Sequence, residues 1–275
     1  MTILQKYKVI IMNIKEILET EKLSNIAWVS KIHAFSSLES TNKTAKVMVE
    51  NGHGHGIIIL ANVQTAGRGR YGRRFHSQSG SGIYITFILE TKHLSFKNPT
   101  LVTLFAAVAV CEAIKRTTKK DPKIKWLNDI FLDGAKIGGI LTEMVAGGEK
   151  IILGIGVNFN IRQSDFPEEL RQIAGSIYRD EKHSTTRGSL IAEIINQIFG
   201  DKMEKTILAQ YRERLFILGQ RVTVFEGQKS YGATAIDIDA NGHLIIQKEE
   251  GDIVSLSSGE VSIQPTEDLA RGVKT

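Results

Sequence analysis

The chain has 275 residues, 42% of them hydrophobic and 24% charged, with 25 Gly, 4 Pro, one Cys and a formal net charge of +5. These fractions are typical of a globular protein and exclude a disordered or fibrous chain, and the length suits one large core with a small second unit. The single Cys (Cys111) excludes an internal disulfide and a cysteine-based zinc site, which favours a reducing compartment, and the positive charge favours an anionic partner of a kind it does not specify.

The most apolar stretch, residues 101–114, is too short for a transmembrane helix, which needs about 20 residues, and it contains Glu112. The N-terminus lacks the pattern of a signal peptide. We therefore expect a cytoplasmic protein with no membrane partner.

Helical and strand patterns alternate through the first part of the chain. We expect, in chain order, a helix over 14–27, a strand over 32–35, a helix capped at Ser40–Asn42 and running to Glu50, and buried strands over 57–62 and 83–89. The Gly-rich segment 51–56 contains two His, but no third metal ligand lies near them, so a surface turn is the favoured interpretation.

The rest of the chain divides into a mixed part and an all-β part. We expect a core helix over 101–117, strands over 123–126 and 130–132, a β pair over 136–145 and 150–158 joined at Gly147–Gly148, and helical periodicity over 187–218. Five short strands separated by turn residues then predict a small β-barrel: 222–225, 233–238, 243–247, 253–256 and 261–263. The expected domains are an N-terminal extension (1–30), a main domain (31–218), the barrel (219–265) and a tail (266–275).

The loop over 64–75 combines three Gly with four Arg: Arg68, Arg70, Arg73 and Arg74. Gly lets backbone N–H groups approach an anion, and Arg binds carboxylate or phosphate oxygens through its planar fork. A P-loop is excluded because no Lys-Ser or Lys-Thr follows, and an RNA-binding Arg-Gly segment would be repetitive and disordered. A solvated surface loop is the remaining alternative to a loop that folds over an anionic ligand.

Two further segments carry polar residues beside apolar strands. Asn128 and Asp129 offer oxygen ligands suited to Mg²⁺, although Asn-Asp is also a common turn pair. Lys136 enters an apolar strand, where an anionic partner is expected because burying a bare ammonium is costly. The Gly residues of 154–160 indicate close approach by a ligand or by another backbone.

These segments resemble the biotin–protein ligases. The hallmarks of that family are G-R-G-R-x-G-R-x-W, K-W-P-N-D, K-x-x-G-I-L-x-E and G-I-G-x-N-x-N, and they stand here, in order, at 67–75, 125–129, 136–143 and 154–160. The Ser40–Asn42 helix start also matches, and the resemblance spans roughly residues 30 to 265. Phe75 replaces the family's Trp, and Leu127 replaces its Pro.

The resemblance implies an α+β fold with a class II aminoacyl-tRNA synthetase-like mixed sheet, flanking helices and a C-terminal SH3-like β-barrel. It implies an ATP-dependent ligase that forms biotinyl-5'-AMP, with Mg²⁺, and transfers biotin to a lysine of the biotin carboxyl carrier protein of acetyl-CoA carboxylase. About 35 residues precede the Ser40 motif, too few for the DNA-binding domain of some members, so no DNA partner is expected. A homodimer is compatible with the resemblance.

The resemblance also assigns roles to individual residues. Arg70 and Lys136 would be catalytic, and Asp129 would bind the metal. The residues implied for biotin are Ser40, Thr41, Asn42, Gln64, Gly67, Arg68, Arg70, Lys136, Gly139, Gly154 and Gly156. Those implied for the nucleotide are Arg68, Arg70, Arg73, Phe75, Asn128 and Asn158.

Two other functions stay open. A lipoate–protein ligase shares this architecture but not the Gly-Arg-Gly-Arg signature, and a non-enzymatic protein could bind nucleic acid through the Arg-rich loop. Because an acyl-adenylate must be shielded from water, we also expect residues 67–73 to be mobile without ligand and ordered with it.

Overall fold

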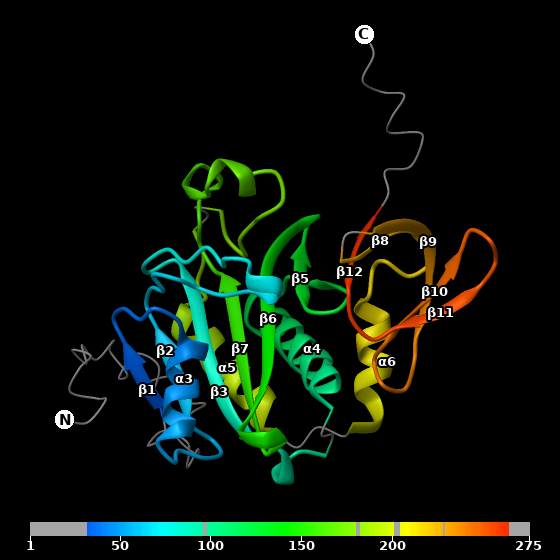
Figure 1. Ribbon diagram of the computed structural model, residues 1–275. Helices are drawn as coiled ribbons and strands as arrows, with labels where there is room; N and C mark the ends of the chain where they lie inside the picture. The colour runs from blue at the N-terminus through cyan, green and yellow to red at the C-terminus, as the bar shows by residue number, and fades with distance from the viewer. Residues whose placement is uncertain (1–31, 96–97, 180–181, 201–203, 228, 264–275) are drawn as a thin grey trace.

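A computed structural model of the chain describes residues 32–95, 98–179, 182–200, 204–227 and 229–263. The helix predicted over 14–27, the N-terminal extension and the tail from 266 lie outside these residues. The described part contains two sheets and four α-helices (Figure 1).

Seven strands form a mixed sheet in the order β1-β2-β3-β7-β6-β5-β4. Only β1 and β2 run parallel, and every other neighbouring pair is antiparallel. The strands are β1 (Ile32–Phe35), β2 (Ile58–Ala61), β3 (Gly82–Glu90), β4 (Lys123–Lys125), β5 (Asp129–Leu132), β6 (Ala135–Val145) and β7 (Lys150–Asn158). The central strands β3 and β7 are the continuous apolar runs of the sequence, as expected for strands covered on both faces.

Helices cover both faces of this sheet. The helix α3 (Thr41–Glu50) packs Ala45 and Met48 on Ile59 and Ile88 of one face. The helices α4 (Pro99–Thr118) and α5 (Arg187–Phe199) pack on the opposite face in the main core (Figure 1). Ser40 caps α3 as predicted, with its side chain accepting from the Lys43 backbone N–H.

The helical stretch predicted over 187–218 is divided, so that prediction is wrong in its continuity. The chain leaves helical geometry at Gly200 (φ −71°, ψ 154°), and a second helix, α6, spans Glu204–Arg214. Glycine is among the poorest helix formers and adopts extended backbone readily, so Gly200 ends α5 although the apolar periodicity runs past it.

Five short strands form the second sheet, in the order β11-β10-β9-β8-β12, with every neighbouring pair antiparallel. They are β8 (Arg221–Glu226), β9 (Lys229–Ile238), β10 (Leu244–Lys248), β11 (Ile253–Leu256) and β12 (Glu260–Ile263). All five overlap strands predicted from the turn residues between them, although β9 begins at Lys229 and not at the predicted 233.

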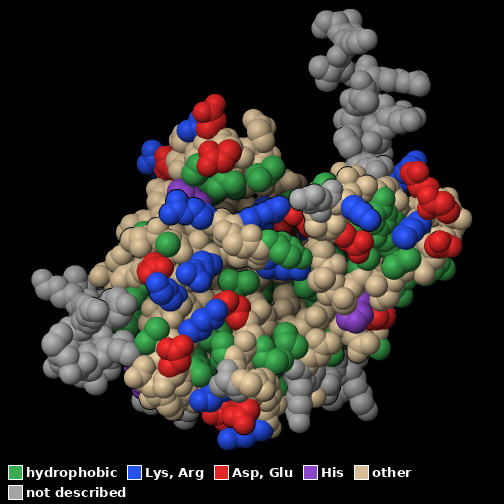
Figure 2. Space-filling model, viewed as in Figure 1, with side chains coloured by type: hydrophobic (Ala, Val, Ile, Leu, Met, Phe, Trp, Pro, Cys, Tyr) green, Lys and Arg blue, Asp and Glu red, His purple; other side chains and the backbone are tan. Residues whose placement is uncertain are grey.

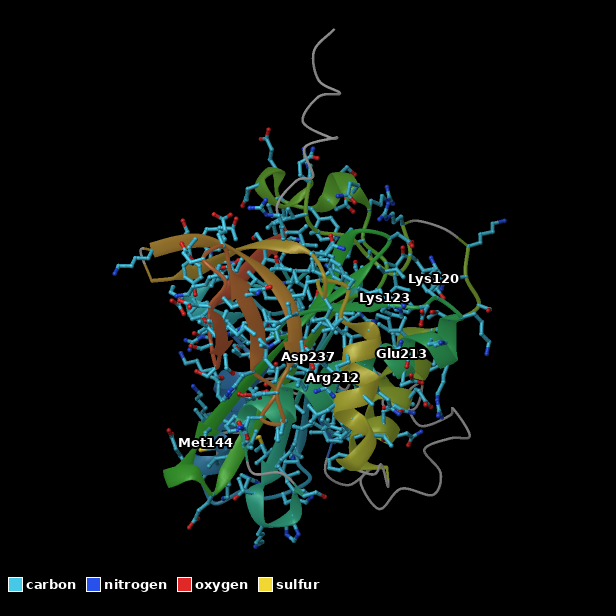
Figure 3. The ribbon with its side chains drawn as sticks, turned by 90° about the vertical axis from the view of Figure 1, so that its right-hand side faces the viewer. Lys120, Lys123, Met144, Arg212, Glu213 and Asp237 are labelled. Carbon is cyan, nitrogen blue, oxygen red and sulfur yellow. The ribbon has the colours of Figure 1, made fainter. Side chains whose placement is uncertain are left out.

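Side chains fix the second sheet against the first, both directly and through α6. Trp126 Nε1 donates to the Gly242 carbonyl at 3.1 Å, and Tyr211 Oη donates to the Leu127 carbonyl at 2.9 Å. Arg212 on α6 and Asp237 on β9 form an ion pair at 2.7 Å, and Figure 3 shows the two side chains between their elements. Among the helices that the structure describes, we find no segment whose length and hydropathy would let it span a bilayer.

Candidate functional site

A cavity of about 230 Å³ lies where the α3 face of the large sheet meets the second sheet. Its walls come from the N-terminal turn of α3, the Arg-rich loop, strands β5 to β7, the segment 166–174 and the start of β12. Every predicted site residue except Gly67 lines it. Residues from four separate sequence motifs therefore share one cavity.

The first turn of α3 forms one wall. Ser40, Thr41 and Asn42 are 1%, 4% and 4% exposed. The Thr41 backbone N–H donates to Gln64 Oε1 at 2.8 Å, which joins the helix start to the chain just after β2. This wall is buried, polar and uncharged.

Glycines on β6 and β7 form the floor. Gly139 pairs with Gly156 across the strands, and Leu141 pairs with Gly154. A Cβ on Gly154 would lie 2.1 Å from Asn42 Oδ1, and one on Gly156 would lie 2.7 Å from the Phe75 ring. These two glycines make room for protein side chains, whereas the nearest atom to a Cβ on Gly139 is 3.7 Å away. All three glycines line the cavity, and Gly139 is the one among them at which a Cβ would meet no atom closer than ordinary contact.

The Arg-rich loop is a closed hairpin over the cavity. An antiparallel bridge joins Arg68 and Arg74, and the Gly69 N–H donates to the Arg73 carbonyl at 2.8 Å. At the turn, Tyr71 adopts a left-handed backbone with φ of 55°. Gly67 pairs with Phe75 at the base of the hairpin and does not line the cavity; a Cβ there would lie 2.6 Å from the Phe75 carbonyl oxygen.

Cations dominate the cavity lining. Six Lys or Arg residues face two carboxylates there. Figure 2 shows Lys and Arg side chains gathered across the middle of this face. Arg70 donates to Asn128 Oδ1 at 3.1 Å, and Lys136 Nζ lies 2.6 Å from Asp129 Oδ1. The anionic partner expected for Lys136 is therefore Asp129. Arg70 and Lys136 are two cations that an anionic ligand in the cavity can contact.

The second sheet contributes Glu260, which the sequence analysis did not identify. Arg73 donates to both carboxylate oxygens of Glu260, at 2.8 and 2.5 Å. These hydrogen bonds lower the pKa of the Glu260 carboxyl. Beside them, the Gly259 N–H donates to Tyr71 Oη at 3.0 Å, so the hairpin is tied to β12 at two points.

Lys125 was also missed, although it begins one of the motifs. It lines the cavity, and burial lowers the pKa of its ammonium. The signal available to sequence reasoning was its position beside buried Trp126 and Leu127. The Trp126–Leu127 peptide is cis.

An apolar cover closes the other side of the cavity. Phe166, Leu170 and Ile173 line it from a segment to which the sequence analysis gave no role. Asn158 is held by its amide, which donates to the Gly175 carbonyl at 2.8 Å. Its Oδ1 is buried and has no hydrogen-bond partner among the described residues, so it can accept a donor from a ligand.

The arrangement is that of an α+β protein built to hold an anionic small molecule between a glycine-floored sheet and an arginine hairpin. Residues 34–160 match the Biotin/lipoate A/B protein ligase family, and residues 217–263 match the Biotin protein ligase C terminal domain. The Bifunctional ligase/repressor BirA of Bacillus subtilis (strain 168) is 34% identical over 235 residues, which cover 82% of this chain and 72% of that protein. The chain belongs to the biotin/lipoate A/B protein ligase family.

Other relatives agree with this membership. The Biotin--[acetyl-CoA-carboxylase] ligase of Mycobacterium tuberculosis is 26% identical over 215 residues, covering 75% of this chain and 78% of that protein. The structure of the biotin protein ligase from Aquifex aeolicus in complex with biotin and ATP superposes with a TM-score of 0.72 at 28% identity, covering 86% of this chain and 99% of that one. The expected class II aminoacyl-tRNA synthetase-like fold with a C-terminal β domain is confirmed.

Proposed function

We propose that the protein is a biotin–[acetyl-CoA-carboxylase] ligase, which activates biotin with ATP and transfers it to a lysine of the biotin carboxyl carrier protein. The observation that carries this proposal is the cavity in which Arg70 and Lys136 face the buried polar turn of α3. The similarity to the Aquifex aeolicus ligase bound to biotin and ATP supports both substrates.

The first step joins two anions. The biotin carboxylate oxygen attacks the α-phosphorus of ATP, the bond to pyrophosphate breaks, and biotinyl-5'-AMP forms. At about 4 Å and an effective dielectric near 20, two unit charges repel by roughly 4 kcal/mol. Arg70 and Lys136 offset this repulsion. Lys136 would break its ion pair with Asp129 and pair with the substrate anions instead.

The second step consumes the mixed anhydride. A neutral carrier lysine attacks the acyl carbon and an amide bond forms. AMP leaves with the electrons of the broken C–O bond, and the amine nitrogen releases one proton to the solvent. The first step needs no protein base, because the biotin carboxyl is already deprotonated at neutral pH. The arginine hairpin and the apolar cover keep water from the anhydride between the two steps.

The two substrates occupy opposite halves of the cavity. Thr41, Asn42 and Gln64 would bind the polar ring of biotin, with its chain over Gly139. The nucleotide would lie between Phe75 and the apolar cover, with the unpaired Asn158 Oδ1 accepting an N–H of the base. Arg73 would bind its phosphates on leaving Glu260.

The residues present fit Mg²⁺ as an ion held mainly by substrate phosphates. Magnesium is usually bound by one or two carboxylates together with phosphates and water, and Asp129 is the carboxylate that lies beside Lys136 in the cavity. The described residues hold no cluster of three or more His, Cys, Asp and Glu suited to a metal. When bound, the ion would supply further positive charge to the phosphates.

Biotin is favoured over lipoate because residues 217–263 match the C-terminal domain of biotin protein ligases. We further propose a cytoplasmic location, in keeping with the buried free Cys111 and the use of ATP. A homodimer stays a prediction, which sedimentation of the purified protein tests.

Calorimetric titration with biotin and with lipoate, followed by mass spectrometry of the nucleotide product after addition of ATP, tests the proposal. We expect saturable heat with biotin alone and a biotinyl-5'-AMP mass after ATP is added. Binding of lipoate in preference to biotin, or binding of oligonucleotides with no adenylate formed, would contradict it.

A further inference from the structure

A series of hydrogen bonds leads from the partly buried Glu143 on β6 to the cavity wall. Asn42 Nδ2 donates to Glu143 Oε2 at 2.9 Å, and Lys46 Nζ pairs with Glu143 Oε1 at 2.6 Å. Thr86 Oγ1 lies 2.7 Å from Asn42 Oδ1 and 2.8 Å from Thr41 Oγ1. Thr86 is 0% exposed, and neither Thr86 nor Glu143 lines the cavity, so both can act on a ligand only through Asn42 and Thr41.

The identity of each proton donor in this series of hydrogen bonds follows from the chemistry of Glu143 at its start. A carboxylate only accepts hydrogen bonds, so Asn42 turns its NH₂ toward Glu143 and its carbonyl oxygen toward Thr86. The amide oxygen also only accepts. Thr86 therefore donates its single hydroxyl proton to Asn42 and has none left for Thr41.

The Thr41 hydroxyl is consequently directed into the protein. Its proton can go to Thr86 Oγ1 at 2.8 Å or to Gln64 Oε1 at 3.1 Å. The Gln64 atom is an oxygen because it also accepts the Thr41 backbone N–H at 2.8 Å. In either arrangement Thr41 presents only a lone pair to the cavity, so it accepts from a ligand and cannot donate to it.

We infer that Glu143 and Thr86 are positioning residues that commit the Thr41 hydroxyl to accept a hydrogen bond from an N–H group of the ligand. The inference rests on the proposed function, since the N–H belongs to the ureido ring of biotin. The dithiolane ring of lipoate carries no N–H and would leave the Thr41 lone pair unpaired. The carboxylate of Glu143 thus contributes to the choice of substrate without touching it.

The test compares Thr86→Val, Thr86→Ser and Glu143→Gln in biotin-dependent exchange of pyrophosphate into ATP. Thr86→Val removes the hydroxyl at nearly constant volume. In Glu143→Gln the introduced amide offers its oxygen to Lys46 and its NH₂ to Asn42, which reverses the donors along the series. We expect KM for biotin to rise about tenfold in Thr86→Val and severalfold in Glu143→Gln, as for loss of a buried hydrogen bond. KM for ATP and kcat should stay within about twofold of the wild-type values, and Thr86→Ser should behave as wild type.

Thr103→Val is the matched control. It removes another buried hydroxyl, which bonds Thr142 at 2.8 Å and does not belong to the hydrogen-bond series from Glu143 to Thr41. A second probe is biotin methylated at a ureido nitrogen. The wild type should strongly prefer biotin to the methylated compound, and Thr86→Val and Glu143→Gln should narrow that preference.

Three results would overturn the inference. One is an unchanged KM for biotin in both Thr86→Val and Glu143→Gln; another is an equal rise in KM for ATP; a third is the same loss in Thr103→Val. Wild-type protein that makes no biotin-dependent exchange would overturn the proposed function itself, so the two failures are distinguished by the wild-type measurement. If a thermal melt shows that Thr86→Val is unfolded, Glu143→Gln decides the matter, because the Glu143 side chain is 25% exposed and its replacement disturbs the core less.

Discussion

Glycines on β6 and β7 differ in what they make room for: a protein side chain at one position and the cavity at another. Gly154 leaves space that the buried Asn42 side chain fills, whereas Gly139 borders open cavity. Asn42 cannot move aside, because it is 4% exposed and hydrogen-bonded to Glu143 and Thr86. The same chemical change at these two glycines should therefore have different consequences.

We expect Gly154→Ala to destabilise the fold by about 1–3 kcal/mol, as overpacking of a filled site does. Gly139→Ala should keep the free energy of unfolding within about 0.5 kcal/mol of wild type and weaken biotin binding instead. Urea unfolding and calorimetric titration of both variants check this. A Gly154→Ala protein as stable as the wild type would contradict the packing described here.

Single residues also show how much of the site can be predicted from the sequence. Local patterns predicted that Arg70 and Lys136 meet an anion and that Ser40 caps a helix. Glu260 could not be, because its partner Arg73 lies 187 positions away in the chain and no local pattern joins them. The same reason hid the Thr41–Thr86 contact, which spans 45 positions.

At the scale of elements, the arginine hairpin holds itself together with a few backbone hydrogen bonds between 67 and 75. Its cationic side chains face the cavity, where the bound substrates would be anionic. Substrate should therefore add contacts that the free hairpin lacks.

We expect trypsin to cleave within residues 68–74 more slowly when biotin and ATP are both present. Cleavage after Lys92, whose side chain is 72% exposed outside the cavity, serves as the internal control and should keep its rate. The measurement is mass spectrometry of limited digests over time. Equal cleavage of the hairpin with and without substrates would rule out ordering by ligand.

Elements differ in how well the sequence predicted them. Strands β3 and β7 were found because long apolar runs of strand length leave little alternative. The break between α5 and α6 was missed because the apolar periodicity continues past Gly200. The extended backbone of that glycine ends the helix nevertheless. The segment 163–174 carries no regular pattern, so its role as a cover over the cavity emerges only in three dimensions.

At the scale of the whole molecule, the cavity exists because the two sheets meet. The Arg73–Glu260 pair and the Tyr71–Gly259 hydrogen bond tie the hairpin of the first part to β12 of the second. The apposition of the two parts should therefore respond to protonation of Glu260.

Glu260 has a pKa below its ordinary value in the folded protein, because Arg73 donates to it. The stabilisation is then present above the ordinary carboxyl pKa of about 4.3 and is lost as pH falls through the lower folded-state pKa. We expect Glu260→Gln to lose at most about 1 kcal/mol at neutral pH and nothing in strong acid, since the pair is partly exposed.

Urea unfolding at several pH values measures this difference. Glu249→Gln is the matched control, because it removes a carboxylate that pairs with Arg221, and neither of these residues lines the cavity. If the Glu260→Gln protein stays less stable than the wild type by the same free energy of unfolding at acid pH, the carboxylate charge is not the cause of the loss.

Exchange of labelled pyrophosphate into ATP measures the first step alone, in which we propose that Arg70 and Lys136 allow two mutually repelling anions to react. We expect biotin-dependent exchange by the wild type, a fall of about 100-fold or more in Arg70→Ala and Lys136→Ala, and full activity in Lys92→Ala, whose lost cation lies outside the cavity. Exchange at the wild-type rate in Arg70→Ala and Lys136→Ala would contradict this proposal.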